Sequence, residues 1–184
     1  MIDQSFSDEN HSMQVFENIE WEACQFKNCR FTDTSFISCT FLDCSFENSD
    51  FSNAKLLNSR FNSCKWSHSK LLGTNWSQTK DCIFLEFQQC ILNYAVFANL
   101  KLSRSIFENC KMIETDFSES DLRECIFKKS DLAATNFNGC DLRKADFREA
   151  RNYSINPLFV KIKKSKFSLP EATSLLNALE IEIT

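Results

Sequence analysis

The chain has 184 residues and a formal net charge of −4, with a sequence pI near 5.3, and its length favours one domain. The acidic balance argues against a directly bound nucleic acid, because such binding depends on Lys and Arg replacing counterions. No apolar run reaches the length of about 18 residues that a membrane span requires. Ten cysteines, without the pattern of a signal peptide, favour reduced thiols and a cytoplasmic location.

The first fifteen residues look irregular. Phe6 fits the spacing that follows, but His11 and Gln14 do not. We predict that residues 1–15 form a cap that shields the first unit of a repeat array.

From Phe16 a large apolar residue recurs at every fifth position as far as Trp76, and a small residue usually stands two positions before it. A period of five matches neither an α-helix nor a flat strand, so it indicates a copied five-residue unit. The small residues include Cys24, Cys29, Thr34 and Cys39. With only two Gly and two Pro, the chain must turn through a repeated non-glycine geometry.

The spacing slips by one residue between Ser77 and Ile83. Asp81 falls where an apolar residue is due, and the pattern resumes at Phe87 and runs to Phe147. We predict a single inserted residue at this point, forming a bulge or a longer corner. Outside the slip, no charged residue between Phe16 and Glu149 occupies a large or a small position, so two positions of every five point inward.

The repeat resembles the pentapeptide-repeat family, whose unit is often written A-(D/N)-L-x-x. The best matches in this chain are Ser120–Glu124, Ser130–Ala134, Cys140–Lys144 and Ala145–Glu149. The resemblance implies an all-β fold over residues 16–153, a right-handed quadrilateral β-helix with four units in each square coil and about seven coils. Residues 20 apart should then stack, with Phe87, Phe107, Phe127 and Phe147 in one column and Leu102, Leu122 and Leu142 in another.

Residues 154–184 follow a different pattern. Asn156–Pro157 marks a break, and residues 159–163 alternate like a short strand. Ser168 and Glu171 form a capping-box pattern that predicts a short helix, followed by a terminal strand over residues 180–183. The apolar face of this helix should cover the last coil, a second subunit or both.

This tail is similar to the ends of the Qnr quinolone-resistance proteins and of the microcin B17 immunity protein. In that branch the tail makes a two-fold homodimer, which forms an acidic rod that mimics DNA and binds DNA gyrase or topoisomerase IV. The resemblance therefore implies a non-enzymatic protein of drug resistance or toxin immunity. Its dimer interface would comprise Leu169, Ala172, Leu175, Leu176, Leu179, Ile181 and Ile183. Qnr proteins carry projecting loops, whereas this chain has one inserted residue and is closer to the loop-free, MfpA-type rod.

No residue pattern predicts catalysis, a cofactor or a metal. Cys24, Cys44 and Cys64 should stack, which allows a metal or redox ladder, but Ser, Thr and Ala replace Cys freely and favour small core filler. His11 and His68 have no partners at metal-ligand spacing and are expected to be solvated. With only Gly73 and Gly139, a Gly-rich phosphate loop cannot be built.

Acidic residues concentrate at the N-terminal end. Residues 1–50 hold ten acids and two bases, a net charge of −8, whereas residues 51–150 and 151–184 each have a net charge of +2. One interpretation is an ordinary hydrated surface; the other is an electrostatic decoy for a basic DNA-binding groove. On the second interpretation the partner-binding surface comprises Glu20, Glu22, Asp33, Asp43, Glu47, Asp50, Asp116, Asp121 and Asp141. A generic scaffold with a different protein partner is the alternative function.

Overall fold

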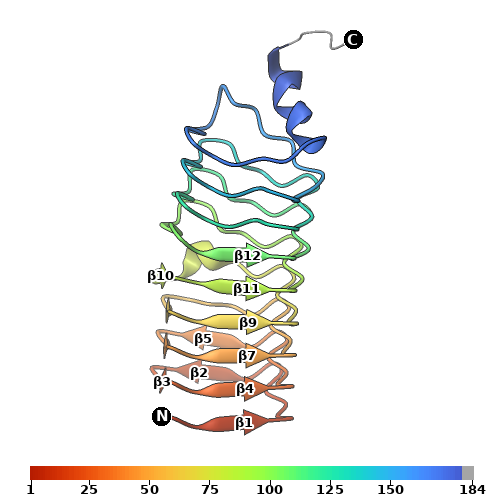
Figure 1. The fold of residues 1–184 in the computed structure, drawn as a ribbon. Helices are drawn as coiled ribbons and strands as arrows, with labels where there is room; N and C mark the ends of the chain where they lie inside the picture. Colours follow the sequence, from red (N-terminus) through yellow and green to blue (C-terminus); the bar gives the residue numbers. More distant parts are fainter. Residues whose placement is uncertain (180–184) are drawn as a thin grey trace.

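A computed structural model describes residues 1–179. As far as Phe167 the chain is a right-handed β-helix, in which four short segments form each square coil and parallel coils stack along one axis (Figure 1). We number the four sides in chain order. Face 1 carries the strands β1 (Ser5–Ser7), β4 (Gln25–Lys27), β7 (Ser45–Glu47), β9 (Lys65–Ser67), β11 (Glu86–Gln88) and β12 (Ile106–Glu108), paired in that order. Face 4 carries β3 (Glu20–Glu22), β6 (Thr40–Leu42), β8 (Arg60–Asn62) and β10 (Asp81–Ile83).

Face 3 begins with β2 (Val15–Glu17) and β5 (Ser35–Ile37), and face 2 is held by single parallel bridges such as Arg30 to Asp50. From residue 109 to residue 166 all sides are joined by such bridges. Register is 20 residues per coil, which confirms the predicted stacking. No helix among residues 1–179 is long and apolar enough to cross a membrane.

Aromatic rings fill the axis of the solenoid. On face 1 each ring stacks on the next with centroids 4.8–5.2 Å apart and interplanar angles of at most 16°. This column comprises Phe6, Phe26, Phe46, Trp66, Phe87, Phe107, Phe127, Phe147 and Phe167. Nearly all central side chains are buried, so the repeat forms one continuous core.

The corners explain how the chain turns with two glycines. The residue two positions after a central residue, here called the corner residue, has a positive φ in every repeat up to Glu149 except at Gln78 in the turn η1 (Trp76–Gln78), and this φ is between 50° and 68° where the residue is not Gly. Many are Asn or Asp, which tolerate this left-handed conformation best, and none is β-branched. The predicted non-glycine turning geometry is therefore confirmed.

The small inward residues do more than fill space. Their hydroxyl or thiol groups donate to a main-chain carbonyl on the preceding coil, for example Cys44 Sγ to the Trp21 oxygen at 3.4 Å and Thr115 Oγ1 to the Leu92 oxygen at 3.0 Å. A buried carbonyl without a donor costs stability, so a small side chain with a donor suits this position.

The single inserted residue is confirmed. Asn75 pairs with Lys55 at the usual offset, but Cys82 pairs with Phe61 at an offset one residue longer. The short 3₁₀ turn η1 (Trp76–Gln78) lies between the two registers. Cys82 thereby occupies a central position, and the charged Asp81 beside it points outward, which explains the apparent break in the pattern.

The N-terminal prediction needs correction. Residues 1–15 are not irregular: they form a regular coil, in which Phe6 pairs with Phe26 and Asn10 with Arg30. His11 is not solvated but takes a central position, with its ring 5.3 Å from that of Phe31, and hydrogen-bonds Glu9 and Gln14. Polar contacts within its own coil allow an imidazole to replace a Phe at the open end of the stack.

The repeat also continues beyond its predicted end. Lys161 bridges to Asp141 and Lys166 to Asp146, so residues 159–163 are part of a coil and not a separate strand. Ile162 packs against the core and Phe167 stacks on Phe147 at 5.2 Å. The number of coils therefore differs slightly from the seven expected.

The C-terminal helix forms, but as the 3₁₀ helix η2 (Glu171–Leu179). Ser168 and Glu171 do not act as a reciprocal capping box. Ser168 Oγ accepts from the backbone N–H of Glu149 at 3.2 Å, and Glu171 Oε1 accepts from that of Asn152 at 3.5 Å. These contacts join the helix start to the last coils. The predicted strand over residues 180–183 lies outside the described residues.

Candidate partner-binding surface

The acidic residues at the N-terminal end are held by strand geometry. Glu20 and Glu22 flank the buried Trp21 in β3, so strand alternation turns both carboxylates outward. Asp43 is exposed at the corner after β6. Within the described part of the chain, none of these three carboxylates forms an ion pair, although the N-terminal ammonium of Met1 lies nearby and donates to the main-chain oxygen of Glu20 at 2.6 Å.

The remaining predicted acids do not join them in one patch. Glu47 lies on face 1 with Lys27 at 3.5 Å, and Asp33 is a corner residue after face 2. On face 2, Asp50 accepts from the Ser52 hydroxyl at 2.6 Å. On face 3, Asp116 accepts from Asn136 Nδ2 at 2.9 Å. The predicted surface is thus spread over all four sides.

In the C-terminal coils, Asp121 and Asp141 are each neutralised by an arginine two residues later. Arg123 Nη2 lies 2.6 Å from Asp121 Oδ2, and Arg143 Nη2 lies 2.6 Å from Asp141 Oδ2. Hydrogen bonds from these guanidinium groups hold the pKa of each carboxyl below its usual value. Asp121 and Asp141 therefore contribute little net negative charge to a partner.

Lysines on the last coil were not among the predicted site residues. Lys161, Lys163, Lys164 and Lys166 are exposed, and none forms an ion pair within residues 1–179. The signal that could have found them is the five-residue spacing from Phe147 through Ile162 to Phe167, which places these lysines on the outside of another coil.

The predicted dimer residues divide between two directions. Leu175 packs against the core cluster of the last coils. Leu169 and Leu176 are exposed, by 80% and 36%, and Ala172 is half-buried. Leu179 ends η2, and Ile181 and Ile183 lie outside the described residues. The helix thus covers the coil stack with one side and leaves apolar side chains on another.

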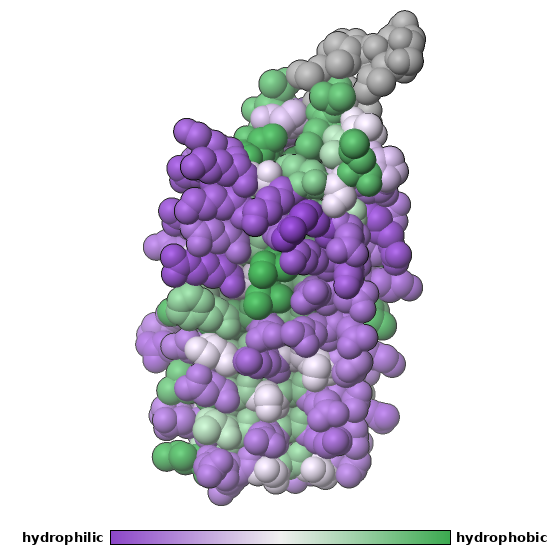
Figure 2. All heavy atoms as spheres, in the orientation of Figure 1, coloured by the Kyte–Doolittle hydropathy of each residue, from purple (hydrophilic) through white to green (hydrophobic). Residues whose placement is uncertain are grey.

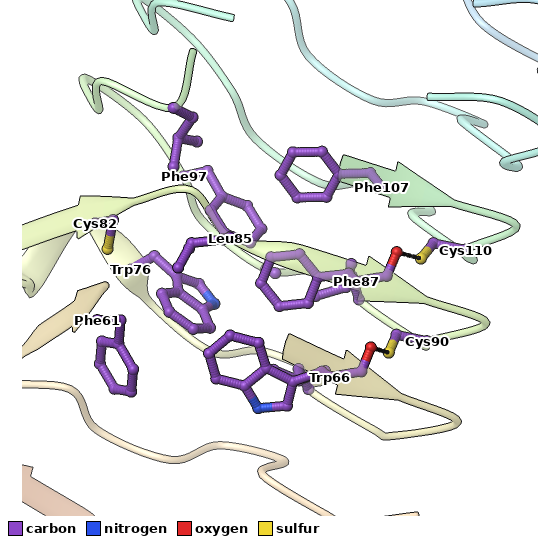
Figure 3. Packing of buried hydrophobic residues seen from close by; sticks show 14 of the residues in the cluster. Phe61, Trp66, Trp76, Cys82, Leu85, Phe87, Cys90, Phe97, Phe107 and Cys110 are labelled. Carbon is purple, nitrogen blue, oxygen red and sulfur yellow. Dashed lines mark hydrogen bonds between the residues drawn. The ribbon is translucent and has the colours of Figure 1, made fainter. Parts of the chain in front are cut away.

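The cysteines lie in the core. All ten are free and buried, and Figure 3 shows Cys90 and Cys110 donating to the carbonyl oxygens of Trp66 and Phe87. Burial raises the pKa of the Cys82 thiol to about 12, which keeps it protonated and unreactive. In the described coils, no three His, Cys, Asp or Glu residues are placed to hold a metal ion.

Comparison with known proteins gives a family and a fold. A family model described as a pentapeptide repeat region matches residues 15–97 and 100–175. No curated protein sequence matches the chain.

Solved structures with the same fold include two trypsin-treated forms of QnrB1, a plasmid-mediated fluoroquinolone resistance protein. Both are 20% identical to this chain, and both matches cover 100% of it. One match covers 98% of the QnrB1 chain with a TM-score of 0.50, and the other covers 99% with a TM-score of 0.52. HetL, a pentapeptide-repeat protein of heterocyst differentiation from the cyanobacterium Nostoc sp. strain PCC 7120, is 13% identical. Its TM-score is 0.45, and the match covers 90% of this chain and 84% of the HetL chain.

Proposed function

This chain belongs to the pentapeptide-repeat family, and from that membership we propose that it is a non-enzymatic cytoplasmic protein that binds a type II topoisomerase. DNA gyrase or topoisomerase IV would bind the acidic coils in place of DNA. In doing so the protein would protect the enzyme from a drug or toxin that traps cleaved DNA.

The observation that carries the proposal is the unpaired acid of the N-terminal coils. Glu20, Glu22 and Asp43 project from a rigid rod and have no ion-pair partner among the described residues, so they can attract a basic groove over a distance. QnrB1, which shares the fold, is a plasmid-mediated fluoroquinolone resistance protein, and this supports a role in drug resistance.

A scaffold for another protein partner is the second candidate. It is favoured by the charge distribution, because Asp121, Asp141 and Asp146 of the C-terminal coils are paired with arginines and the last coil is basic. A DNA mimic joined through its C-terminal tails would therefore be basic at its centre and acidic only at its two tips.

Supercoiling by purified gyrase tests the first candidate. The protein is titrated to micromolar concentration with and without a fluoroquinolone, and supercoiled and cleaved plasmid are measured. Without the drug, we expect inhibition of supercoiling. With the drug, we expect a smaller amount of cleaved plasmid. Either result would support topoisomerase binding. If neither quantity changes, and topoisomerase IV behaves likewise, topoisomerase binding is excluded and the scaffold function is favoured.

Charge-reversed variants show whether the acidic coils carry the binding. The triple variant Glu20→Lys, Glu22→Lys and Asp43→Lys should need a protein concentration at least about tenfold higher to produce the same effect on gyrase. Reversal of three exposed or corner carboxylates in the C-terminal half, Glu114, Glu119 and Glu149, makes the same change in net charge and is the matched control. Equal effects of the two sets would show that only net charge matters.

A further inference from the structure

One edge of the solenoid, where face 4 turns into face 1, is organised differently from the others. Its nine corner residues follow one another in a column with positive φ. They are Asp3, Ala23, Asp43, Ser63, Phe84, Arg104, Glu124, Lys144 and Lys164. The column begins with an acid, ends with two bases and has an aromatic residue at its midpoint.

The two ends of this edge carry opposite charges without partners. Asp3, Glu20 and Glu22 lie at the N-terminal end, and Lys161, Lys163 and Lys164 lie at the other. None of the six forms an ion pair with another described residue. A span of eight coil steps of about 4.8 Å, about 38 Å in all, separates them, so salt screens their attraction within one molecule.

Apolar side chains are exposed at the middle of the edge. Phe84 is 51% exposed and Ile83, at the end of β10, is 37% exposed. Figure 2 shows apolar atoms at this height, beside β10 and β11, between hydrophilic atoms above and below. A bulky ring at a φ of 52° is conformationally unfavourable, and Asn serves at many equivalent corners, so neither folding nor hydration explains this Phe.

A hollow lies next to the exposed ring. It has a volume of about 180 Å³ and is lined by Phe84, Ser103, Arg104, Arg123 and Glu124. An aromatic side chain entering it would contact Phe84 and two guanidinium groups, which bind aromatic faces favourably.

We propose that this edge is a self-association surface on which two copies of the chain bind side by side in antiparallel orientation. The two-fold axis passes near Phe84, so each Phe84 ring enters the hollow of the other copy. The acidic end of each copy then faces the basic end of its partner, and the interface is self-complementary.

The position of each residue along the edge supports this orientation. Phe84 has four corner residues on either side of it, so rotation about it brings Asp3 opposite Lys164 of the second copy. In the neighbouring column of face 4, Glu22 comes opposite Arg143, which is already paired with Asp141 at 2.6 Å, so the main charge contact is that of Asp3 with Lys164. One column further from the edge, Glu20 comes level with Asp141 and takes no part in the charge pairing. Asp43 comes opposite Glu124, whose charge is already balanced by Arg104 at 3.2 Å and Lys144 at 2.9 Å.

Other arrangements of the same surface are disfavoured by charge. Parallel copies would place acid against acid at one end and lysine against lysine at the other. Association of two N-terminal ends would bring together segments that each carry a net charge of −8 over residues 1–50. The contact is also separate from η2 and therefore independent of the tail-mediated dimer and of topoisomerase binding.

The first test is the dissociation constant of the dimer, measured by analytical ultracentrifugation of the full chain. Phe84→Asn keeps a residue suited to the corner and should raise the constant at least about tenfold. Tyr94→Asn is the matched control, because Tyr94 is also an aromatic corner residue with positive φ and is 54% exposed. It should change the constant less than about twofold.

The second test exchanges charges between copies. One variant combines Asp3→Lys and Glu22→Lys, and the other combines Lys163→Glu and Lys164→Glu. Each alone places like charges opposite each other and should remain monomeric, whereas a mixture of the two should form heterodimers. Association of the unmodified chain should weaken as salt rises from about 0.05 M to about 0.5 M.

Leu176→Glu separates this contact from a tail dimer, because it changes an exposed residue of η2 and leaves the edge intact. The edge dimer should persist in this variant. A chain that stays monomeric at every concentration, or a dimer that survives Phe84→Asn but is lost on Leu176→Glu, would overturn the proposal whatever the outcome with gyrase.

Discussion

The N-terminal and C-terminal coils follow the same five-residue plan but fill the axis differently. The coil from Phe26 to Phe41 has an aromatic residue at all four central positions. From Phe87 to Leu142 aromatic residues occupy faces 1 and 3 only, and aliphatic residues occupy faces 2 and 4. The rings of faces 1 and 3 then meet edge to face, as Phe107 and Phe117 do at 5.3 Å and 80°.

The corners and surfaces differ too. After every central Leu or Met the corner is closed by a main-chain hydrogen bond, such as Ala145 N to the Leu142 oxygen at 2.9 Å, as expected for a type II turn. Most N-terminal corners after a Phe on faces 1 and 4 lack this bond, and their sides are extended strands. Ring stacking thus runs through both halves on face 1, but only the N-terminal coils have rings on all four sides. The comparison teaches that closed turns and ion pairs add the support that the C-terminal coils lack on faces 2 and 4.

The largest expected effect comes from deleting a stacked ring. Phe46 lies between Phe26 and Trp66, with both centroid distances 4.9 Å, so Phe46→Ala leaves a cavity that the columns cannot collapse into. We expect a loss of about 3–5 kcal/mol in the free energy of unfolding, measured with urea. Leu122→Ala, at a buried aliphatic position in the C-terminal coils, should cost about 2–4 kcal/mol. If Leu122→Ala lowered the free energy of unfolding more than Phe46→Ala does, the proposed difference between the N-terminal and C-terminal coils would be wrong.

Acidification should affect the C-terminal coils first. The pKa values of Asp121, Asp131, Asp141 and Asp146 are lowered in the folded chain. Their contribution to stability is therefore complete above the ordinary Asp pKa of about 3.9 and is lost as the pH falls through the lower folded values. Hydrogen exchange at pH 3, corrected for intrinsic rates and compared with pH 6, should rise more in residues 92–167 than in residues 16–75. Equal increases would show that the ion pairs do not stabilise these coils.

A single ion pair should have a smaller effect. Asp146 is 8% exposed; burial tends to raise the pKa of its carboxyl, but hydrogen bonds and charge from Arg148 outweigh burial and lower it. Asp146→Asn keeps an acceptor for the Arg148 backbone but removes the charge. We expect a loss of about 1–2 kcal/mol in urea denaturation. The loss should shrink at high salt, and a salt-independent loss would indicate packing instead of charge.

The smallest effect is expected at the unpaired acids. The double substitution Glu20→Gln and Glu22→Gln should change the free energy of unfolding by less than about 0.5 kcal/mol, because both carboxylates are exposed and neither is in an ion pair with a described residue. The free energy of unfolding of this double variant is measured by urea denaturation under the conditions used for Asp146→Asn, so that the two losses can be compared directly. A large destabilisation would mean that these acids serve the fold and would remove them as binding residues.

Much of the fold was predictable from the five-residue repeat. One position in each repeat must be large enough to fill the axis, and a second must be small enough to lie close to the neighbouring coil. Phe87 and Phe107 stack as predicted, and the cysteines lie inside. The ends were harder. His11 is polar and residues 148–161 break the apolar pattern, so sequence alone suggested a cap and an early end.

The sequence by itself determined the inward columns, the register slip and the uneven distribution of acids, since each follows from residue type and spacing along the chain. Only the tertiary structure decided which charges meet. Coils of 20 residues bring Arg104 and Lys144 beside Glu124 in ion-paired form and place Lys161 on the last coil. They also place Phe84 midway between unpaired acids and lysines. Such neighbours depend on how the coils stack, because residues far apart in sequence share one edge only when the square closes.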